Sequence, residues 1–438
     1  MLNIIETTFL LHSLKRNLNL SRERSEALQL SNLKKIISHA YFHVPYYKGL
    51  FDKVNFKPSE IKSVEDISKI PTTSKGQLQS VPLNNITADN IDLNNCFEDV
   101  TSGSTGIPLK VFLTPKDYLI RSLIFIRTFM KAGYRLTDKQ AIVTDTRFIT
   151  EKKYLLQKLG IFRKAYVPVQ IDIDKQIDIL MEFRPDFIHG YPQSIAAIAD
   201  RLIKKKITSI SPRMVCTGAE LVSRKTRLLI NQAFGVDMSD TYASIESGLI
   251  AWQCEKRKGY HINQDHVVIE ILKDGCPAMP GEAGKVVITN LHSYAMPIIR
   301  YELGDICVLS DANCSCGCAT PLISIVKGRV DDMIYTPSKK TVSPNSITNA
   351  MEAVEGVQQF RIIQEQINSL QIEIVKGEMF SDQTQNQCMA LMKDLVGEEM
   401  EINIHLLDHI KKDSSGKIRA VISKISKQIQ KPELSKGA

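Results

Sequence analysis

The chain has 438 residues, of which 43% are hydrophobic and 24% charged, and its formal net charge is +8. A chain of this length predicts two or three domains with substantial cores, since one domain commonly holds about 100–200 residues. The modest and scattered charge disfavours a nucleic-acid-binding protein. No apolar run approaches the ~20 residues that a membrane span needs.

Residues 1–95 predict helices and irregular turns. The first segment, MLNIIETTFLLHSLKRN, lacks the basic leading region and the small-residue cleavage site of a signal peptide. We expect a docked or amphipathic helix there, with contact to a membrane surface or a partner as the alternative. The apolar pattern from Ser21 to about Leu50 predicts an amphipathic helix that is stopped at Pro45. The stretch IPTTSKGQL predicts a further helix start after Pro71.

Residues 96–330 alternate between predicted strands and helices. The strand LKVFLT, the helix KDYLIRSLIFIRTFMKAG and the strand QAIVTDT come first, and further helices are expected from about Ser194 and about Ser223. This alternation predicts α/β layers with a largely parallel sheet. From about Tyr260 to Ile325, β-rich runs between Gly/Pro turns predict a smaller mixed or barrel-like sheet.

Residues 331–438 predict a small α+β domain. A helix from about Pro344, a hairpin FRIIQEQINSLQIEIVKG, a helix at about Gln383–Leu395 and a strand EINIHLL follow one another. The predicted fold class is therefore α/β. It has a large N-terminal domain with layered sheets and a small β-rich subdomain, and then a small mobile C-terminal domain.

The stretch TSGSTG stands between the predicted strand CFEDV and the strand LKVFLT. Glycines permit positive φ and a close backbone approach, successive amides can form an anion-binding nest, and the hydroxyls add donors. A plain hairpin loop explains the motif equally well, and the absence of a following GK[ST] excludes a Walker A loop. Its candidate residues are Ser102, Gly103, Ser104, Thr105 and Gly106.

Five further motifs follow in the chain, and each alone is typical of an ordinary structural turn. Six in a fixed order, however, indicate one site. The five are CTGAEL at a strand end, DTYASIESG, IIRYELGD, GRVDD at the predicted domain boundary and KKDSSGKIRAV near the C-terminus.

With these motifs the sequence resembles the adenylate-forming acyl ligases. Within them it is most similar to the phenylacetate–CoA ligase branch and its relatives in capsular-polysaccharide biosynthesis. The stretches HVPYYKG and IPTTSKGQL also resemble that branch, so the resemblance covers nearly the whole chain.

The resemblance implies that ATP and Mg²⁺ are used to activate a carboxylate. TSGSTG would hold the β- and γ-phosphates, a carboxylate would bind Mg²⁺, and an aspartate would accept the ribose hydroxyls. The implied catalytic residues are Lys417, Glu246 and Arg329, and the implied hinge is Asp331. Besides TSGSTG, the implied nucleotide-binding residues are Gly218, Ala219, Glu220, Asp240, Tyr242, Ala243, Ser244 and Asp305.

Two motifs depart from the family pattern. The family usually has Gly after the Tyr and a hydroxyl residue before the Glu, where this chain has Ala243 and Ile245. This leaves the role of Ser244 open. ELGD also replaces the more usual Arg-Thr-Gly-Asp, which removes one expected contact on the nucleotide side.

Nine cysteines in so long a chain do not indicate a disulfide scaffold, and the predicted compartment is the cytoplasm. Cys254, His261, Cys314 and Cys316 would make a tetrahedral Cys₃His zinc set, with Cys318 as a spare ligand. Ordinary thiols are the alternative, because the CxC spacing is irregular. Some members of the resembled branch bind zinc with matching Cys-x₆-His and Cys-x-Cys spacings, which favours a structural zinc ion.

The predicted function is an ATP-dependent ligase that forms an acyl-adenylate and passes the acyl group to an acceptor. Amide formation with an amine, amino-acid or sugar acceptor in capsule biosynthesis is the first candidate, and thioester formation with CoA is the second. Adenylyl transfer and a non-catalytic nucleotide-binding partner are the further alternatives. No nucleic acid or membrane span is expected, and the chain is expected to be a monomer or a homodimer.

Overall fold

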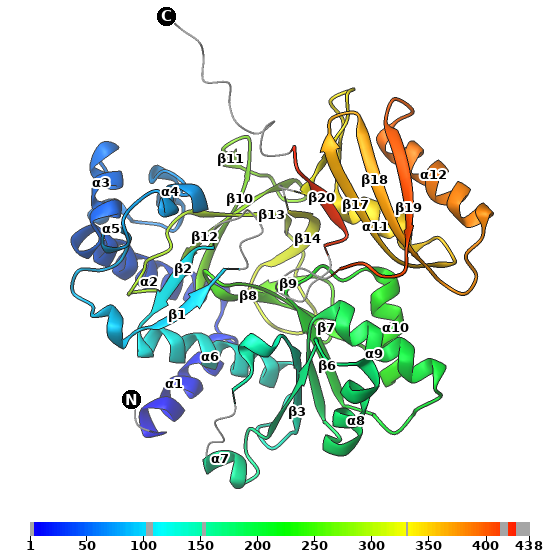
Figure 1. Ribbon diagram of the computed structural model, residues 1–438. Helices are drawn as coiled ribbons and strands as arrows, with labels where there is room; N and C mark the ends of the chain where they lie inside the picture. Colours follow the sequence, from blue (N-terminus) through cyan, green and yellow to red (C-terminus); the bar gives the residue numbers. More distant parts are fainter. Residues whose placement is uncertain (1–3, 102–107, 151–154, 330–331, 412–418, 426–438) are drawn as a thin grey trace, which may run out of the picture.

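The structure, a computed structural model, describes residues 4–101, 108–150, 155–329, 332–411 and 419–425 (Figure 1). The N-terminal helices lie on one side of the molecule, and the C-terminal sheet with its helices lies on the other (Figure 1). Within the described residues, no helix has the length and apolar character needed to cross a membrane.

The N-terminal helices begin and end where the sequence predicts. Ser21 caps α2 (Arg22–His43) by accepting a hydrogen bond from the Arg24 amide, and Pro45 opens α3 (Pro45–Lys53). An apolar cluster packs α2 and α3 against the β-rich half of the large sheet. The other elements of this region are α1 (Ile4–Asn17), η1 (Pro58–Glu60), η2 (Glu65–Lys69), α4 (Lys75–Gln79), α5 (Leu83–Ile86) and η3 (Leu93–Asn95).

One half of the large sheet is parallel, as the alternation of strands and helices predicts. Its strands run in the order β7 (Ser239–Ser244), β6 (Met214–Gly218), β5 (Phe187–Gly190), β3 (Gln140–Thr144) and β4 (Lys164–Pro168). One face packs on α8 (Ile173–Phe183), α9 (Pro192–Lys204) and α10 (Arg224–Phe234), and the other meets α6 (Pro115–Lys131). The short η4 (Thr146–Phe148) and α7 (Leu155–Lys158) connect β3 to β4.

The β-rich segment does not form the separate sheet that the sequence predicts, because hairpin pairing extends the parallel half into one 12-stranded sheet. β7 pairs antiparallel with β8 (Gly248–Trp252), β8 with β9 (Tyr260–Ile262), and β9 with β14 (Leu322–Arg329). The sheet then continues through β13 (Tyr301–Ser310), β12 (Ala283–Asn290), β10 (Val267–Lys273) and β11 (Cys276–Pro277). A separate antiparallel hairpin is formed by β1 (Phe97–Val100) and β2 (Lys110–Leu113).

The C-terminal elements follow the predicted order. A sheet in the order β19 (Glu401–Leu407), β18 (Ser369–Lys376), β17 (Val357–Gln366), β20 (Val421–Ser423) packs on α11 (Pro344–Glu352) and α12 (Asp382–Val396). A small two-stranded ladder, β15 (Ile334–Tyr335) with β16 (Thr341–Val342), precedes α11. The α/β fold class, with an α+β C-terminal part, is thereby confirmed.

Candidate active site

The candidate site begins at the carboxyl ends of β6 and β7, which run parallel with Gly218 opposite Thr241. A Cβ atom at Gly218 would lie 2.5 Å from the Thr241 hydroxyl oxygen, so only glycine fits this approach. The next residue, Ala219, has φ +70° and is exposed. With no side chain at Gly218 and only a methyl group at Ala219, this strand end allows a close approach to its backbone.

Two predicted nucleotide-binding residues that lie far apart in the sequence are in contact. The Tyr242 hydroxyl on β7 donates a hydrogen bond of 2.7 Å to the Asp305 carboxylate on β13. The backbone of Arg329 stands opposite Asp305 in the β13–β14 pairing, and the structure describes only the backbone of Arg329. The motifs DTYASIESG and IIRYELGD therefore meet at one place, as expected of motifs that belong to one site.

Glu246 lies in the turn between β7 and β8, close to a second tyrosine. The Tyr301 hydroxyl donates a hydrogen bond of 3.1 Å to Glu246 Oε1, which orients this carboxylate. The Asn290 amide nitrogen lies 3.5 Å from the Glu246 carbonyl oxygen. The Ser244 hydroxyl accepts a hydrogen bond of 3.1 Å from the Ser247 amide and so holds the turn.

Arg121 of α6 is a site-supporting residue that the sequence does not reveal. Its guanidinium donates to the carbonyl oxygens of Ser244 and Ile245 at 3.3 and 3.0 Å, and to Asp99 at 3.2 Å. Burial lowers the pKa of Arg121, while the charges of Asp99 and Glu246 raise it. Asp99 lies on β1, shortly before TSGSTG, so Arg121 ties that motif's leading strand to the Glu246 turn.

Asp240, predicted as a nucleotide-binding residue, is 3% exposed and is held by protein groups. Its two carboxylate oxygens accept hydrogen bonds of 2.6 Å each from the Thr217 and Tyr260 hydroxyls. Burial raises the pKa of Asp240, and these two bonds oppose that shift. This arrangement favours a positioning role for Asp240 between β6, β7 and β9. Glu220 is half-buried at the end of β6, where its carboxylate lies 3.4 Å from the Gln193 amide.

Several predicted residues lie outside the described part of the chain, namely Ser102, Gly103, Ser104, Thr105, Gly106, Asp331 and Lys417. Their flanking residues are described. Thr101 and Leu109 exchange two hydrogen bonds, from the Thr101 amide to the Leu109 carbonyl at 3.0 Å and from the Leu109 amide to the Thr101 hydroxyl at 2.8 Å. Arg419 forms an ion pair with Asp332, so the chain beyond Lys417 lies beside the chain that follows Asp331.

A Cys/His cluster lies where the β8–β9 turn meets the loop before β14. The ligand atoms of Cys254, His261, Cys314 and Cys316 all lie within 4.8 Å of one another. The Sγ atoms of Cys254 and Cys314 are 3.5 Å apart, and Cys316 Sγ is 3.3 Å from His261 Nε2. Burial alone would raise the pKa of Cys314, but hydrogen bonds from the Cys316 amide and the Cys254 thiol lower it.

This cluster fits a zinc ion. A tetrahedral zinc ion with bonds of about 2.3 Å separates two thiolates by roughly 3.8 Å, close to the spacing seen. His261 Nδ1 lies 3.2 Å from the Thr320 hydroxyl, which leaves Nε2 facing the thiols. Cys318 points elsewhere, because its Sγ lies 3.6 Å from the Leu18 carbonyl oxygen. The four predicted ligands are therefore brought together without the spare one.

Comparison with known proteins gives two groups of relatives. Residues 334–424 match the family model described as the CapK C-terminal domain. The phenylacetate-coenzyme A ligase of Thermus thermophilus is 27% identical over 354 residues, covering 78% of this chain and 79% of that protein. The Aromatoleum evansii enzyme of the same name is 29% identical, covering 72% of each chain. Protein CapK of Staphylococcus aureus is 22% identical, covering 92% of this chain and 91% of that protein.

Solved structures of acid–CoA ligases share the fold. 2-Hydroxyisobutyryl-CoA ligase, in the postadenylation state with 2-HIB-AMP, superposes with a TM-score of 0.79 at 18% identity, covering 94% of this chain and 93% of that chain. The same enzyme in the thioesterification state, with 2-HIB-AMP and CoA, gives 0.64 at 18% identity, covering 95% and 94%. The resemblance drawn from the six motifs is confirmed, since the homologues are phenylacetate-CoA ligases and CapK.

Proposed function

We propose that this chain, a homologue of the phenylacetate-CoA ligases and of CapK with the fold of the adenylate-forming ligases, activates a carboxylic acid with ATP. The observation that carries the proposal is the 2.7 Å hydrogen bond between Tyr242 and Asp305. It joins two motifs assigned to the nucleotide, next to the strand end at Gly218. The enzyme would form an acyl-adenylate and then transfer the acyl group.

The adenosine part of ATP would lie across the ends of β6 and β7. The Tyr242 ring would cover one face of the adenine, and the exposed backbone at Ala219 would line the other side. Asp305 would accept hydrogen bonds from the ribose hydroxyls, because a carboxylate accepts several donors. The Tyr242 hydroxyl, which donates to Asp305, holds that carboxylate in place before the nucleotide arrives.

The triphosphate would lie between TSGSTG and the Glu246 turn. Amides and hydroxyls of Ser102–Gly106 would bind the phosphate oxygens. Glu246 would be a ligand of Mg²⁺, a hard cation that prefers carboxylate and phosphate oxygens. Bound there, the ion would offset the negative charge of the phosphates. Arg121 would keep the leading strand and the turn in register, since it bonds to both.

In the first half-reaction, a carboxylate oxygen forms a bond to the α-phosphorus while the bond to the bridging oxygen breaks, and pyrophosphate leaves. Lys417 would lie between the carboxylate and the α-phosphate as a point charge. In the second half-reaction, the acceptor attacks the acyl carbon, loses its proton, and AMP leaves. Rotation about Asp331 would withdraw Lys417 between the two steps.

CoA is the acceptor that the relatives favour, because four curated homologues are named phenylacetate-coenzyme A ligase. An amine acceptor is the second candidate. It rests on the resemblance of the six motifs to the capsular-polysaccharide relatives. Protein CapK, which aligns over 92% of this chain, and the match of residues 334–424 to the CapK C-terminal domain keep that candidate in view. A role in capsule or surface-polysaccharide biosynthesis belongs to this second candidate.

The Cys/His cluster would hold one structural zinc ion. All four positions of a tetrahedral site are filled by protein, which leaves none for a substrate. The cluster joins the β8–β9 turn to the loop before β14, so zinc would stabilise the point where the two halves of the large sheet meet.

ATP–pyrophosphate exchange tests the proposal. Aryl acids, uronic acids and amino acids would each be supplied without an acceptor. We expect exchange that depends on one class of acid, because only the carboxylate can displace pyrophosphate. Binding of ATP without exchange on any acid of the panel would contradict acyl-adenylate formation. That result would favour adenylyl transfer or a non-catalytic nucleotide-binding role.

A further inference from the structure

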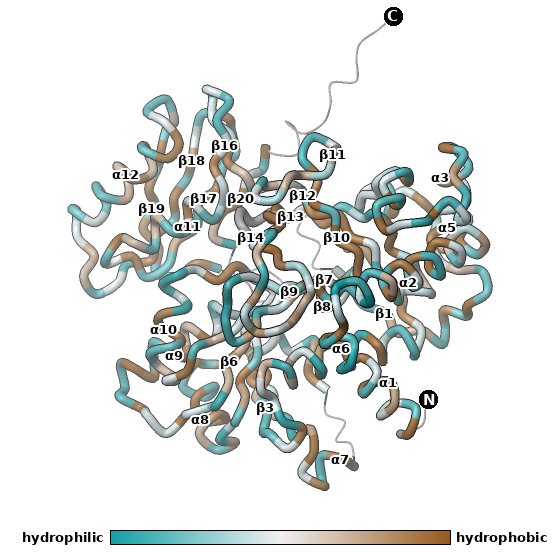
Figure 2. Tube along the Cα trace, turned by 180° about the vertical axis from the view of Figure 1, so that it is seen from behind, coloured by the Kyte–Doolittle hydropathy of each residue, from teal (hydrophilic) through white to brown (hydrophobic). Residues whose placement is uncertain are grey.

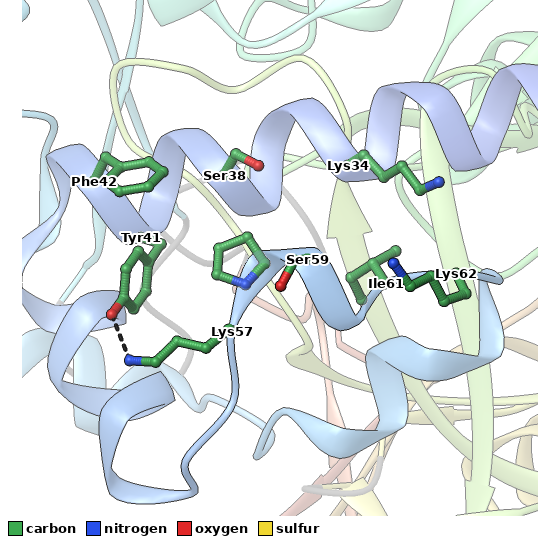
Figure 3. A pocket seen from close by; sticks show the side chains of 9 residues that line it. Lys34, Ser38, Tyr41, Phe42, Lys57, Ser59, Ile61 and Lys62 are labelled. Atoms are coloured by element: carbon green, nitrogen blue, oxygen red, sulfur yellow. Dashed lines mark hydrogen bonds between the residues drawn. The ribbon is translucent and has the colours of Figure 1, made fainter.

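A surface groove lies between α2 and the loop that contains η1, on the side of the molecule away from the C-terminal sheet (Figure 2, Figure 3). It has a volume of about 630 Å³. None of the described residues of the candidate active site lines it. The lining residues are Lys34, Ser38, Tyr41, Phe42, Lys57, Pro58, Ser59, Ile61 and Lys62.

One end of the groove is aromatic. Phe42 is 69% exposed, an unusual position for so large an apolar side chain. Its ring meets Tyr41 edge-on, with centroids 5.3 Å apart. Tyr41 is fixed in place, because its hydroxyl accepts a hydrogen bond of 2.7 Å from Lys57 and donates one of 2.9 Å to Asp52. The groove therefore offers a preformed apolar wall.

The other end of the groove is cationic. Lys34 and Lys62 lie there, as Figure 3 shows. Among the described residues, neither lysine side chain is held in an ion pair, whereas Lys57 is paired with Asp52 at 2.9 Å. The lining contains three lysines and no carboxylate. Two positive charges are therefore available to a ligand.

The spacing of the two ends limits the ligand. Lys34, Ser38 and Phe42 follow one another at intervals of four residues along one face of α2. Eight residues of helix span about 12 Å, a length that about four residues of extended peptide cover at about 3.3 Å each. The groove thus suits a short extended segment rather than a globular surface.

We propose that this groove binds an acidic segment of a partner protein, with an apolar side chain against Phe42 and a carboxylate three or four residues away at Lys34 and Lys62. Charge complementarity carries the choice, since the charged side chains among the lining residues are all lysines. The neighbouring Glu60 and Asp66 carboxylates accept hydrogen bonds from backbone amides. A nucleic acid fits less well, because phosphates would need basic residues along the whole length and half of this groove is apolar.

Selection of random dodecapeptides displayed on phage against the full chain tests the proposal. Selected peptides should share an apolar residue followed by acidic residues three or four positions later. A fluorescein-labelled copy of the consensus should bind at least about tenfold more weakly to the double variant Lys34→Glu/Lys62→Glu. Phe42→Ser should independently weaken binding of this peptide, and added salt should weaken its binding to the unmodified chain.

The matched control is Lys35→Glu/Lys53→Glu. These lysines are also exposed and close in sequence, but they do not line the groove. The control should bind within about twofold of the unmodified chain. Circular dichroism should be unchanged in all variants, because the altered side chains are exposed.

Three results would overturn the proposal. The selection could yield no peptide, or peptides without acidic residues. The control could lose as much affinity as the groove variant. Finally, a labelled single-stranded DNA 20-mer or phosphatidylglycerol vesicles could bind the unmodified chain and lose as much affinity as the peptide does in Lys34→Glu/Lys62→Glu. That result would assign the groove to phosphate groups instead.

Discussion

Replacing Arg127 by methionine tests how the N-terminal helix is fastened to the large sheet. Arg127 of α6 is fully buried, and its guanidinium donates to both carboxylate oxygens of Asp265 at 2.5 and 2.6 Å. It also donates to the Leu14 carbonyl of α1 at 2.9 Å. The Asn17 amide adds a bond of 2.7 Å to Asp265. One arginine therefore joins α1, α6 and the loop before β10.

The expected loss of stability follows from the buried Asp265 carboxylate that Arg127→Met leaves without its partner. Burial alone would raise the pKa of Asp265, but Arg127 outweighs burial and holds that pKa at about 2. Without Arg127, the carboxylate is buried with no counter-ion, and breaking such a pair costs about 3–5 kcal/mol. In the unmodified chain, the stability from Asp265 is present above about pH 4 and is lost as the pH falls towards 2, because the folded pKa lies below the unfolded value.

Urea unfolding followed by the fluorescence of Trp252, the single tryptophan, measures this loss. The double variant Arg127→Met/Asp265→Leu should recover more than half of it, since no unpaired charge remains. The control Arg201→Met breaks an exposed pair with Asp174 and should cost less than about 1 kcal/mol. A single variant no less stable than this control, or a double variant no better than the single, would refute the reasoning.

Three further predictions concern pH, metal and catalysis. Burial lowers the pKa of His266 to about 3, below its unfolded value of about 6.5, so the native state binds fewer protons. Lowering the pH from about 6.5 to 5 should therefore remove about 2 kcal/mol from the free energy of unfolding. Urea titrations of His266→Gln should show a weaker dependence of this free energy on pH, and an unchanged dependence would contradict the prediction. Metal analysis after metal-free purification should find about one equivalent of zinc. Cys316→Ser should lose this zinc and the exposed Cys276→Ser should keep it; less than about a tenth of an equivalent in the unmodified chain would count against the site. Lys417→Ala should lower acid-dependent ATP–pyrophosphate exchange about 100-fold or more, while Lys411→Ala should leave it within about threefold; near-normal exchange in Lys417→Ala would remove that residue from the mechanism.

The ends of the helices could be predicted because local chemistry decides them. Ser21 and Ser223 cap the helices that follow them, and Pro45 and Pro344 stand at first helical positions. These signals act within a few residues, so a single sequence carries them.

The joining of the large sheet could not be predicted, because it depends on pairing between distant strands. β9 has only three residues, and its pairing of His261 with Leu322 bridges 61 positions in the sequence. Nothing in the residues around Tyr260 shows whether strand β9 pairs with β14 or belongs to a separate barrel-like sheet. The predicted Cys/His set spans the same two segments, but only the fold shows that the two features coincide.

The candidate site was partly visible in the sequence. The motifs predict Tyr242, Glu246 and Asp305 as candidate residues, because an aromatic ring and carboxylates within short, ordered motifs can be read directly from the sequence. Arg121 left no such signal, because an arginine within an amphipathic helix is ordinary and its carbonyl partners lie 123 and 124 positions away. Asp240 shows the converse case. Its place in a motif predicts contact with the nucleotide, but the sequence does not reveal that the Thr217 and Tyr260 hydroxyls occupy both of its carboxylate oxygens.

Oxygen transfer from the acid to AMP tests the central claim most directly. An acid that supports exchange would be labelled with ¹⁸O in both carboxylate oxygens and turned over with ATP and an acceptor. If the carboxylate attacks the α-phosphorus, the bond from that oxygen to phosphorus persists, and the AMP released should carry one ¹⁸O atom. Unlabelled AMP, or AMP retained on the acceptor, would contradict an acyl-adenylate intermediate.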